Sequence, residues 1–331
     1  MDLKGDKLRM KKGDLLFAKR NAYLRRVAIA PHDGFFSAHG MVLRPKSSRV
    51  WPDFLPFFLR SDVFMNRAVE ISVGSLSPTI NWGTLRNQEF ALPPVEEQKR
   101  IAEVLWAADK LVRRNENVLE AALMLRKSRL SDLRQPNGHF EAERGCLGDY
   151  VDRIVGGGTP ARNKQEYWNG DIPWMTVKDI PDSGHIGETQ EHISNEGLED
   201  SATHLIEQGS VILATRISVG KVVMNDVDLA INQDLKAIYP SRDLDGQFLF
   251  YWLQSMEEDI RGRSAGTTVK GIRLENLKSI PCVLPPLRLQ ERLVDELRAM
   301  DSSVAASKEN LLDAFRLETS LTDFMIGAAH V

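Results

Sequence analysis

The sequence predicts an α+β protein built from two mixed α/β domains, each followed by a long helix, with the two helices pairing as an antiparallel coiled coil. The main observation is a Leu-Pro-Pro segment that occurs twice, at 92–101 and 284–293, with a shared Gln and Arg and an offset of 192 residues. In both copies the prolines end a β-like segment that they cannot continue, and an amphipathic helix then begins. The chain therefore consists of two copies of a domain followed by a helix.

The composition is that of a globular protein in a reducing compartment. A chain of 331 residues, 42% of them hydrophobic, can bury two cores of ordinary size. Its two cysteines, Cys146 and Cys282, argue against a disulfide framework and against a zinc site. The first residues contain no apolar signal core, and no run of 18 apolar residues occurs. We therefore expect a soluble, cytoplasmic protein with no membrane partner.

The small net charge of −3 hides an asymmetry between the two halves. Residues 1–92 hold 15 Lys and Arg against 8 Asp and Glu, whereas residues 141–285 hold 14 against 23. A basic first half indicates nucleic acid as a partner, but the acidic second half does not support it. Charge alone therefore leaves the nature of the partner open.

The first domain, residues 1–92, is predicted to mix short strands with one helix. A glycine turn leads into a buried strand at 13–18, and the apolar run at 27–30 is typical of a second strand. A helix is expected at 53–69, because phenylalanines and valines recur on one face of it. A loop rich in Gly, Ser and Pro, at 74–81, then leads towards the first Pro-Pro.

The segment 93–140 contains the first long helix, expected at 96–134. About 38 residues span about 57 Å at 1.5 Å per residue, a length typical of a coiled coil. Asn115 would be a polar residue that sets the register of the seam. The predicted heptad seam consists of Ile101, Val104, Ala108, Leu111, Asn115, Val118, Ala122 and Leu125, with Leu105, Val112 and Leu119 widening it.

The second domain, residues 141–285, is also predicted to be mixed. Its aromatic residues Trp168 and Trp174 are expected in the core. Short strands are expected around 151–155, 172–175, 211–214 and 221–224, a helix at 248–256, and a loop at 266–272.

The segment 286–331 contains the second long helix, expected at 288–325. Two matching helices in one chain can pair with each other, and an antiparallel pair would relate the two halves by pseudo-twofold symmetry. The second predicted seam consists of Leu293, Leu297, Met300, Val304, Ser307, Leu311, Ala314, Glu318, Leu321 and Met325.

The similarity between the halves extends beyond the Pro-Pro segments. Residues 12–18 match 208–214, and Gly74 and Asp109 match Gly266 and Asp301. This pattern indicates one duplicated unit. A duplicated unit with a rigid spacer suits a ligand with two separated sites, and DNA is a ligand of that kind.

Cations and hydroxyl groups follow a buried strand in each domain, and such residues suit contacts with phosphates and base edges. A solvated hairpin or an ordinary polar turn explains them as well. The candidate DNA contacts in these turns are Lys19, Arg20, Tyr23, Arg25 and Arg26 in the first domain and Arg216, Ser218 and Lys221 in the second. A second pair of loops adds Ser75 and Ser77, and Thr267, Thr268 and Lys270.

No catalytic constellation is recognisable. The seven histidines show no metal-ligand spacing, no acid pair stands out, and no nucleophile-elbow motif organises the serines. The glycine-rich stretch 156–160 lacks the Gly-Lys-Ser/Thr ending of a phosphate-binding loop, so a tight turn is the simpler interpretation.

The sequence resembles the specificity subunits of type I restriction-modification systems. The resemblance rests on Gly157-Gly158-Thr159-Pro160, on Tyr-Trp-Asn-Gly-Asp-Ile-Pro-Trp at 167–174, and on the two Leu-Pro-Pro…Gln…Arg helix starts, and it covers nearly the whole chain. It implies two target recognition domains that each read one part of a bipartite site in double-stranded DNA. It also makes Gly157, Gly158 and Thr159 candidate DNA contacts.

The resemblance further implies partners that perform the chemistry. The paired helices would set the spacing and dock methyltransferase (M) subunits, and a restriction (R) subunit would join the complex. S-adenosylmethionine, ATP and magnesium are expected on those partners, and this chain is expected to have no cofactor, no metal and no catalytic residue.

The first domain departs from the family pattern. Gln208 lies 63 residues after the start of the second domain near Gly145, whereas its counterpart Lys12 has 11 residues before it. We therefore expect residues 1–92 to form a partial recognition domain without about 50 residues, including any Gly-Gly-Thr-Pro segment. Such a domain could be truncated, completed by a separate chain, or the product of a mis-started gene.

Two other functions compete with DNA recognition. A coiled-coil scaffold that docks partner subunits without reading DNA would agree with the acidic second domain. A free-standing enzyme would show turnover from the purified chain, which we do not expect. Steep salt dependence of duplex binding would favour recognition over the scaffold.

Overall fold

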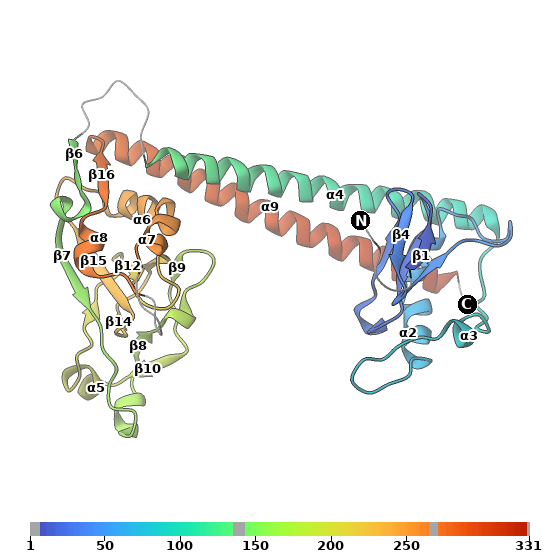
Figure 1. The fold of residues 1–331 in the computed structure, drawn as a ribbon, viewed down its shortest axis with the longest axis horizontal. Coiled ribbons are helices and arrows are strands. Elements are labelled where there is room, and N and C mark those ends of the chain that lie inside the picture. The colour runs from blue at the N-terminus through green and yellow to red at the C-terminus, as the bar shows by residue number, and fades with distance from the viewer. Residues whose placement is uncertain (1–6, 135–142, 265–270, 330–331) are drawn as a thin grey trace. The chain divides into compact units, whose positions relative to one another are not determined.

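The computed structural model describes residues 7–134, 143–264 and 271–329 and divides the chain into two compact units. Unit 1 comprises residues 1–120 and 306–331, and unit 2 comprises residues 121–305. Two long helices, α4 (Val95–Asp132) and α9 (Leu287–Ala328), contribute to both units (Figure 1). Among the described residues, no helix combines the length and the apolarity needed to span a membrane.

Unit 1 is a small antiparallel β structure covered by helices. Its sheets have the orders β1-β4 and β3-β2-β5. Its strands are β1 (Lys7–Met10), β2 (Leu15–Ala18), β3 (Val27–Ile29), β4 (Gly34–Ser37) and β5 (Gly40–Leu43). Its helical elements besides the long helices are η1 (Ala22–Leu24), α1 (Leu55–Arg60), α2 (Asp62–Glu70) and α3 (Trp82–Leu85).

The predicted single helix at 53–69 is wrong, because the structure has two helices there. Ser61 has extended backbone (φ −67°, ψ 157°) and separates α1 from α2. Its hydroxyl donates to the carbonyl of Phe58 at 2.7 Å and so helps to end α1. Apolar spacing missed this break because Phe58 and Phe64, on either side of it, pack in the same core.

Unit 2 is larger and contains three sheets, with the orders β7-β15-β12-β13-β9, β10-β8-β14-β11 and β16-β6. Its strands are β6 (Glu143–Cys146), β7 (Val151–Gly156), β8 (Ile172–Met175), β9 (His185–Ile186), β10 (Glu191–Ile193), β11 (Leu205–Ile206), β12 (Val211–Ala214), β13 (Val222–Asn225), β14 (Leu229–Ile231), β15 (Leu235–Pro240) and β16 (Pro281–Leu284). Its helical elements are η2 (Leu147–Tyr150), η3 (Gln165–Trp168), η4 (Val177–Asp179), α5 (Asn195–Glu199), α6 (Gly246–Ser255), α7 (Glu257–Gly262) and α8 (Leu274–Lys278).

The core of unit 2 forms where α6 packs on β12 and β13. All four residues of β12 are buried, as expected for a central strand covered on both faces. The helix expected at 248–256 is confirmed as α6, which buries seven of its ten residues. Trp174 is also buried as expected, with 1% of its surface exposed, whereas Trp168 is only half-buried.

The two units share one strand arrangement, with β3-β2-β5 matching β13-β12-β15. In unit 1, Leu15 lies opposite Ile29 and Leu43. In unit 2, Val211 lies opposite Met224 and Ile238. The pair β1-β4 likewise matches β11-β14. Both pairs are antiparallel, and each joins the strand that directly precedes the central β2 or β12 to the strand that follows β3 or β13. The predicted duplication is therefore a duplication of strand order and register.

The repeated glutamine explains why the Pro-Pro segments match. The Gln98 side chain accepts from the Trp51 amide and donates to the Arg49 and Pro93 carbonyls. Gln290 makes the same three bonds, with the Asp245 amide and with the Asp243 and Pro285 carbonyls. In each unit a buried Gln thus ties the start of a long helix to the loop that enters an aromatic helix, α1 or α6. This motif is structural.

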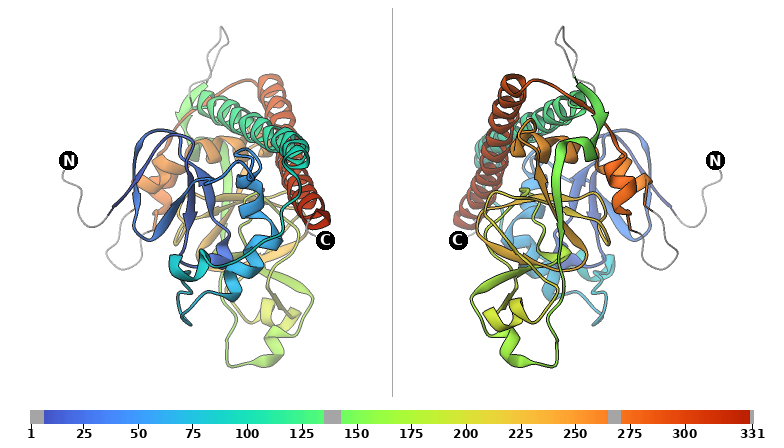
Figure 2. Two further views of the ribbon diagram at one scale, coloured as in Figure 1. Left: turned by 90° about the vertical axis from the view of Figure 1, so that its right-hand side faces the viewer. Right: turned by 90° about the vertical axis from the view of Figure 1, so that its left-hand side faces the viewer.

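The two long helices run antiparallel in both units. In unit 1, Ile101 near the start of α4 shares a core with Ile326 near the end of α9. In unit 2, Arg129 near the end of α4 bonds Glu296 near the start of α9. The predicted antiparallel pairing is confirmed, and Figure 2 shows the two helices in two further views. The α9 seam is also confirmed, since its ten predicted positions are buried or half-buried.

The predicted α4 seam is partly wrong. Val104, Leu111, Val118 and Leu125 are 42–59% exposed. The residues that were expected only to widen the seam lie closer to its centre: Leu105 and Val112 are buried, and Leu119 is half-buried. Both tracks fit a three–four spacing with Ile101 and Ala108, so periodicity could not choose between them. The surface that packs against α4 buries the track that is offset by one residue, which contains Leu105 and Val112.

A pair of adjacent substitutions tests this register. We expect Leu105→Ala to lower the free energy of unfolding by about 3 kcal/mol, because Leu105 is fully buried. Val104→Ala should change it by less than about 0.5 kcal/mol, because that side chain is 42% exposed. Chemical denaturation followed by circular dichroism would measure both, and similar losses would contradict the assigned seam.

Candidate nucleic-acid interface

In unit 1, the basic turn after β2 lies against the loop at 74–81. Arg20 forms an isolated bridge with Thr79, and the Asn21 amide donates to the Pro78 carbonyl at 2.7 Å. The Ser77 hydroxyl donates to the side-chain oxygen of Asn21 at 3.0 Å. The structure therefore brings together Arg20 and Ser77, which the sequence nominated from two separate stretches.

These groups line a pocket of about 290 Å³. Its charged and hydroxyl-bearing lining residues are Arg20, Arg26, Ser37, His39 and Ser77, and no carboxylate is among the lining residues that the structure describes. Guanidinium and hydroxyl donors that converge without a carboxylate fit a phosphate oxygen. Sequence reasoning missed Ser37 and His39. Ser37 ends β4, His39 lies in the turn between β4 and β5, and both become neighbours of Arg20 only through sheet pairing.

The other nominated residues of unit 1 are placed differently. The Arg25 guanidinium bonds Asp62 and Asn66 of α2, so it holds the turn against that helix. Tyr23 is 56% exposed, and Ser75 is exposed in its loop. Lys19 is half-buried, and its carbonyl accepts from the Ile80 amide. Their roles toward DNA stay predictions.

The equivalent turn of unit 2 presents fewer free cations. Arg216 forms a bridge with Gly271 that matches the bridge of Arg20, but its guanidinium lies 3.5 Å from the carboxylate of the buried Asp234. The neighbouring Lys236 has a lowered pKa, because burial and then the charge of Arg216 disfavour its ammonium form. Ser218 and Lys221 are exposed. Thr267, Thr268 and Lys270 lie outside the described residues.

Both turns contain left-handed residues at equivalent positions. Asn21 has φ +52°, and Ile217 and Ser218 have φ +46° and +50°. A β-branched residue such as Ile217 is strained in this region, at a cost of about 1–3 kcal/mol. Such strain persists where the surroundings fix it and is frequent at functional sites. The same unusual backbone at the same place in both units supports a common role for these turns.

The glycine-rich loop of unit 2 is closely packed. A Cβ atom on Gly157 would lie 1.9 Å from the Ile231 carbonyl oxygen, and one on Gly158 would lie 2.6 Å from the Ala202 backbone. The Gly158 amide donates to the Ile231 carbonyl at 3.1 Å. The exposed Thr159 donates to the side chain of Gln233 at 2.6 Å. Close packing thus explains both glycines, and DNA contact by this loop stays a prediction.

A glycine pair tests the packing of this loop. We expect Gly157→Ala to destabilise unit 2 by about 3 kcal/mol, because the new methyl group would overlap backbone that cannot move aside. Gly246→Ala is the matched control, since nothing lies within 4 Å of its Cβ position. Thermal unfolding would measure both changes. Equal losses of stability would show that the backbone around Gly157 can move aside to accommodate the methyl group.

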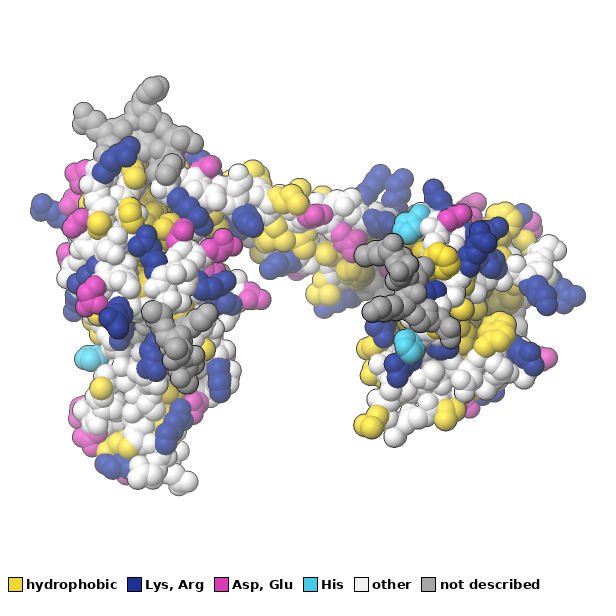
Figure 3. All heavy atoms as spheres, viewed as in Figure 1, with side chains coloured by type: hydrophobic (Ala, Val, Ile, Leu, Met, Phe, Trp, Pro, Cys, Tyr) yellow, Lys and Arg dark blue, Asp and Glu magenta, His cyan; other side chains and the backbone are white. Residues whose placement is uncertain are grey.

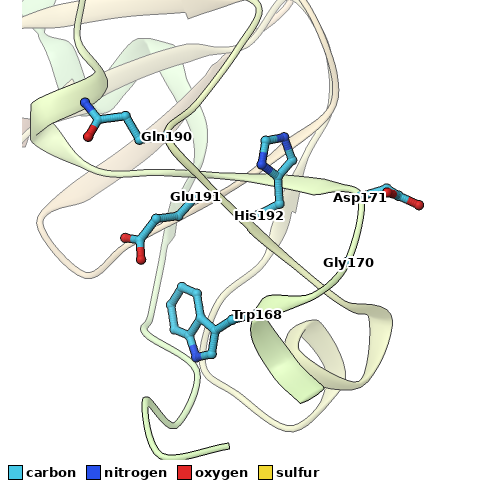
Figure 4. Close-up of a pocket in the computed structure, with 6 residues that line it drawn as sticks. All are labelled: Trp168, Gly170, Asp171, Gln190, Glu191 and His192. Carbon is cyan, nitrogen blue, oxygen red and sulfur yellow. The ribbon is translucent and has the colours of Figure 1, made fainter. Parts of the chain in front are cut away.

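Unit 2 also has a polar pocket of about 470 Å³, lined by Trp168, Gly170, Asp171, Gln190, Glu191 and His192 (Figure 4). The guanidinium of Arg162 lies 3.7 Å from the ring centroid of Trp168 and bonds Glu191, whose pKa this bond lowers. In Figure 4, Glu191 points toward Trp168, whereas His192 and Asp171 point away from it. The pocket therefore does not gather its titratable groups into a catalytic set.

Metal-binding clusters and buried nucleophiles are the other features of the chain that could form a site. Among the described residues, no group of three or more His, Cys, Asp or Glu side chains could hold a metal ion. Burial raises the pKa of the Cys282 thiol to about 12, so it stays protonated at neutral pH and is a poor nucleophile. The remaining candidate for a functional site is the charged surface. In Figure 3, basic side chains predominate over acidic ones on the visible face of unit 1.

Comparison with known proteins gives one consistent family. A family model described as the type I restriction modification DNA specificity domain matches residues 3–121 and 141–314. A putative type I restriction enzyme MjaX specificity subunit of Methanocaldococcus jannaschii is 26% identical over 92% of this chain and 75% of its own length. The EcoR124I/EcoR124II specificity subunit of Escherichia coli is 30% identical over 58% of this chain. The chain spans about half the length of that E. coli relative.

Solved structures share the fold. A chain from a study of the assembly and conformational transition of the type I R-M system matches with a TM-score of 0.68 and 22% identity, over 96% of this chain and 82% of that one. The HsdS subunit from Thermoanaerobacter tengcongensis matches with a TM-score of 0.52 and 23% identity, over 96% of this chain and 81% of that subunit. These similarities confirm the predicted α+β architecture with two long helices.

Proposed function

Because the chain belongs to the type I restriction modification DNA specificity family, we propose that it is the sequence-specific DNA-binding subunit of a type I restriction-modification complex. The observation that supports this most is the repeated turn, with Arg20 and Arg26 in unit 1 and Arg216 and Lys221 in unit 2 after equivalent strands. Cations on a strained, fixed turn suit the phosphate contacts that position a protein on a duplex.

In this proposal each unit reads one block of a bipartite target in double-stranded DNA. The antiparallel helices hold the two readers at a set spacing and dock the methyltransferase subunits, and the restriction subunit joins through them. The chemistry belongs to those partners, which would hold S-adenosylmethionine, ATP and magnesium. This chain contributes binding and position, in the reducing cytoplasm.

A second function has its own support in unit 2. The pairing of Arg216 with the buried Asp234 offsets one cation of the turn, and residues 141–285 are acidic overall. A chain in which unit 2 does not read DNA would act as a coiled-coil scaffold for partner subunits. Duplex binding that falls steeply with salt would favour recognition, whereas partner binding without DNA affinity would favour the scaffold.

Methylome sequencing tests the proposal directly. The chain would be expressed with its cognate modification subunit, and cells without its gene would be the control. We expect a split motif, two short blocks around a fixed gap. A single block or its palindrome would mean that only one unit reads DNA. No motif, with the modification subunit shown to be active, would reject recognition and leave the scaffold.

A further inference from the structure

The turn between β14 and β15 presents one polar side chain on a fixed backbone. Asn232 and Asp234 are buried and bond each other twice, because the Asp234 amide donates to the Asn232 side chain at 3.0 Å and the Asn232 side chain donates to the Asp234 carboxylate at 3.2 Å. Gln233 lies between them and is exposed. The surroundings therefore hold the turn in one conformation, and only Gln233 of its three residues can reach a ligand.

Backbone bonds tie this turn to the two other segments of unit 2 that are candidates for DNA contact. The Asp234 carbonyl accepts from the Arg216 amide at 3.2 Å, at the start of the strained turn after β12. The Ile231 carbonyl accepts from the Gly158 amide at 3.1 Å, in the glycine-rich loop. Gln233 therefore belongs to one continuous surface that is formed by three loops from separate parts of the sequence.

A hydroxyl group from the glycine-rich loop orients the Gln233 amide. The Thr159 hydroxyl donates to the side-chain oxygen of Gln233 at 2.6 Å. An amide oxygen has two lone pairs, and an amide nitrogen has two N–H groups. The oxygen of Gln233 therefore keeps one lone pair available, and its nitrogen makes no hydrogen bond to any residue that the structure describes. Gln233 thus presents an acceptor and a donor side by side, and Thr159 determines which end of the amide is the oxygen.

An adjacent acceptor and donor match one base edge in the major groove. Adenine presents the N7 acceptor beside the N6 amino donor, and a glutamine amide can bond both at once. Guanine presents two acceptors, so one of them would face the amide oxygen. Cytosine and thymine each present one hydrogen-bonding group there. An amide with a fixed orientation therefore favours adenine over the other three bases.

The equivalent position of unit 1 has no amide side chain. Gly40 begins β5 and Leu235 begins β15, at matching registers against the central strands. Ala38, two residues before Gly40, is therefore the counterpart of Gln233. An alanine side chain makes no hydrogen bond, so the two units do not share this contact, and a change at Gln233 should alter one block of the target and not the other.

We propose that Gln233 reads an adenine in the DNA block recognised by unit 2, and that Thr159 is a positioning residue that sets the orientation of the Gln233 amide. This assignment rests on the proposed function and names one specificity-determining contact within it. A bidentate contact of this kind favours the matching base by about tenfold or more in affinity. Phosphate contacts by the neighbouring cations would position the duplex without adding to this preference.

Methylome sequencing of single-residue variants tests the assignment. Each full-length variant would be expressed with the cognate modification subunit and compared with the parent chain. Gln233→Ala should make one adenine position of one block accept all four bases and leave the other block unchanged. Gln233→Glu should shift that position from adenine to cytosine, because a carboxylate accepts from the cytosine N4 amino group. Gln208→Ala is the matched control and should keep the parent motif, because Gln208 is exposed before the opposite end of β12.

Variants of Thr159 separate orientation of the amide from support of the fold. Thr159→Val removes the hydroxyl group and should broaden the same position of the motif, whereas Thr159→Ser retains it and should keep the parent motif. A purely structural role would lower the thermal stability of Thr159→Val and leave the motif unchanged. Fluorescence anisotropy of the purified complexes, with duplexes that differ at this one base, should show about a tenfold preference for adenine in the parent and none in Gln233→Ala.

The other results would overturn the assignment in distinguishable ways. A split motif that both Gln233 variants leave unchanged would mean that the bond to Thr159 is structural and that Gln233 reads no base. Loss of methylation at both blocks in a folded Gln233→Ala variant would make Gln233 a general binding contact. A change of motif in Gln208→Ala as well would show that the effect is not specific to Gln233. A parent chain without any motif would reject the proposed function, and this assignment with it.

Discussion

Replacing both Arg20 and Arg26 with alanine should weaken duplex binding about 100-fold and make it less sensitive to salt. Both guanidinium groups line the pocket of unit 1, whose described lining residues include no carboxylate. A hydrogen bond to a charged group contributes about 1.5 kcal/mol, which is about tenfold in affinity for each cation. Each lost phosphate contact should also reduce the slope of log affinity against log salt by about 0.9, so the double variant should lose about 1.8.

Fluorescence anisotropy with a duplex that carries the methylated motif would measure the effect over a series of salt concentrations. Lys46→Ala with Arg49→Ala is the matched control, because it removes the same charge from exposed positions outside the pocket. If the control lost as much affinity and slope, the general charge of unit 1 would explain binding and the pocket would not be a specific contact site.

The corresponding variant of unit 2, Arg216→Ala with Lys221→Ala, should lose less affinity than the variant of unit 1. Arg216 already pairs with the buried Asp234, so part of its charge is offset in the free protein. Removing Arg216 would also leave that carboxylate without its ion pair, so the folded state must be checked by thermal unfolding. An equal or larger loss of affinity would show that the ion pair between Arg216 and Asp234 breaks when the protein binds DNA.

The fold was largely predictable because its strongest signals are local. The Pro-Pro helix starts and the strands at 13–18 and 211–214 follow from residue type and spacing, and the structure places them as expected. The break at Ser61 was not predictable, and neither was which of the two candidate tracks on α4 is buried. Both depend on which surface packs against the helix, and that choice is made by residues far away in the sequence.

The candidate site was predictable only in part, for a related reason. Arg20 and Ser77 were nominated separately from composition, and only the structure shows that they adjoin through Asn21. His39 joins them only because β4 and β5 fold back on the sheet, and Asp234 reaches Arg216 in the same way. Whether a cation is free or already paired is therefore a tertiary property, and the sequence of a basic turn does not reveal it.

Replacing Gln290 with leucine should lower the stability of unit 2 by about 3–5 kcal/mol. Gln290 is fully buried and bonds the Asp245 amide and the Asp243 and Pro285 carbonyls at 2.7–2.9 Å. Leucine has a similar size but would leave these three backbone groups buried without partners, at about 1–3 kcal/mol for each unsatisfied group. The loss should spread to α6, because Asp245 caps that helix through the Phe248 amide.

Hydrogen exchange followed by mass spectrometry would locate this loss. Gln290→Leu should speed exchange in α6 and the sheets of unit 2, and Gln98→Leu should do the same in unit 1, since Gln98 makes the equivalent bonds. Glu291→Leu, at the adjacent exposed position, is the control and should change little. If both glutamine variants kept the stability of the parent, the repeated motif would have a role outside the fold, and a surface for partner subunits would be the next hypothesis to test.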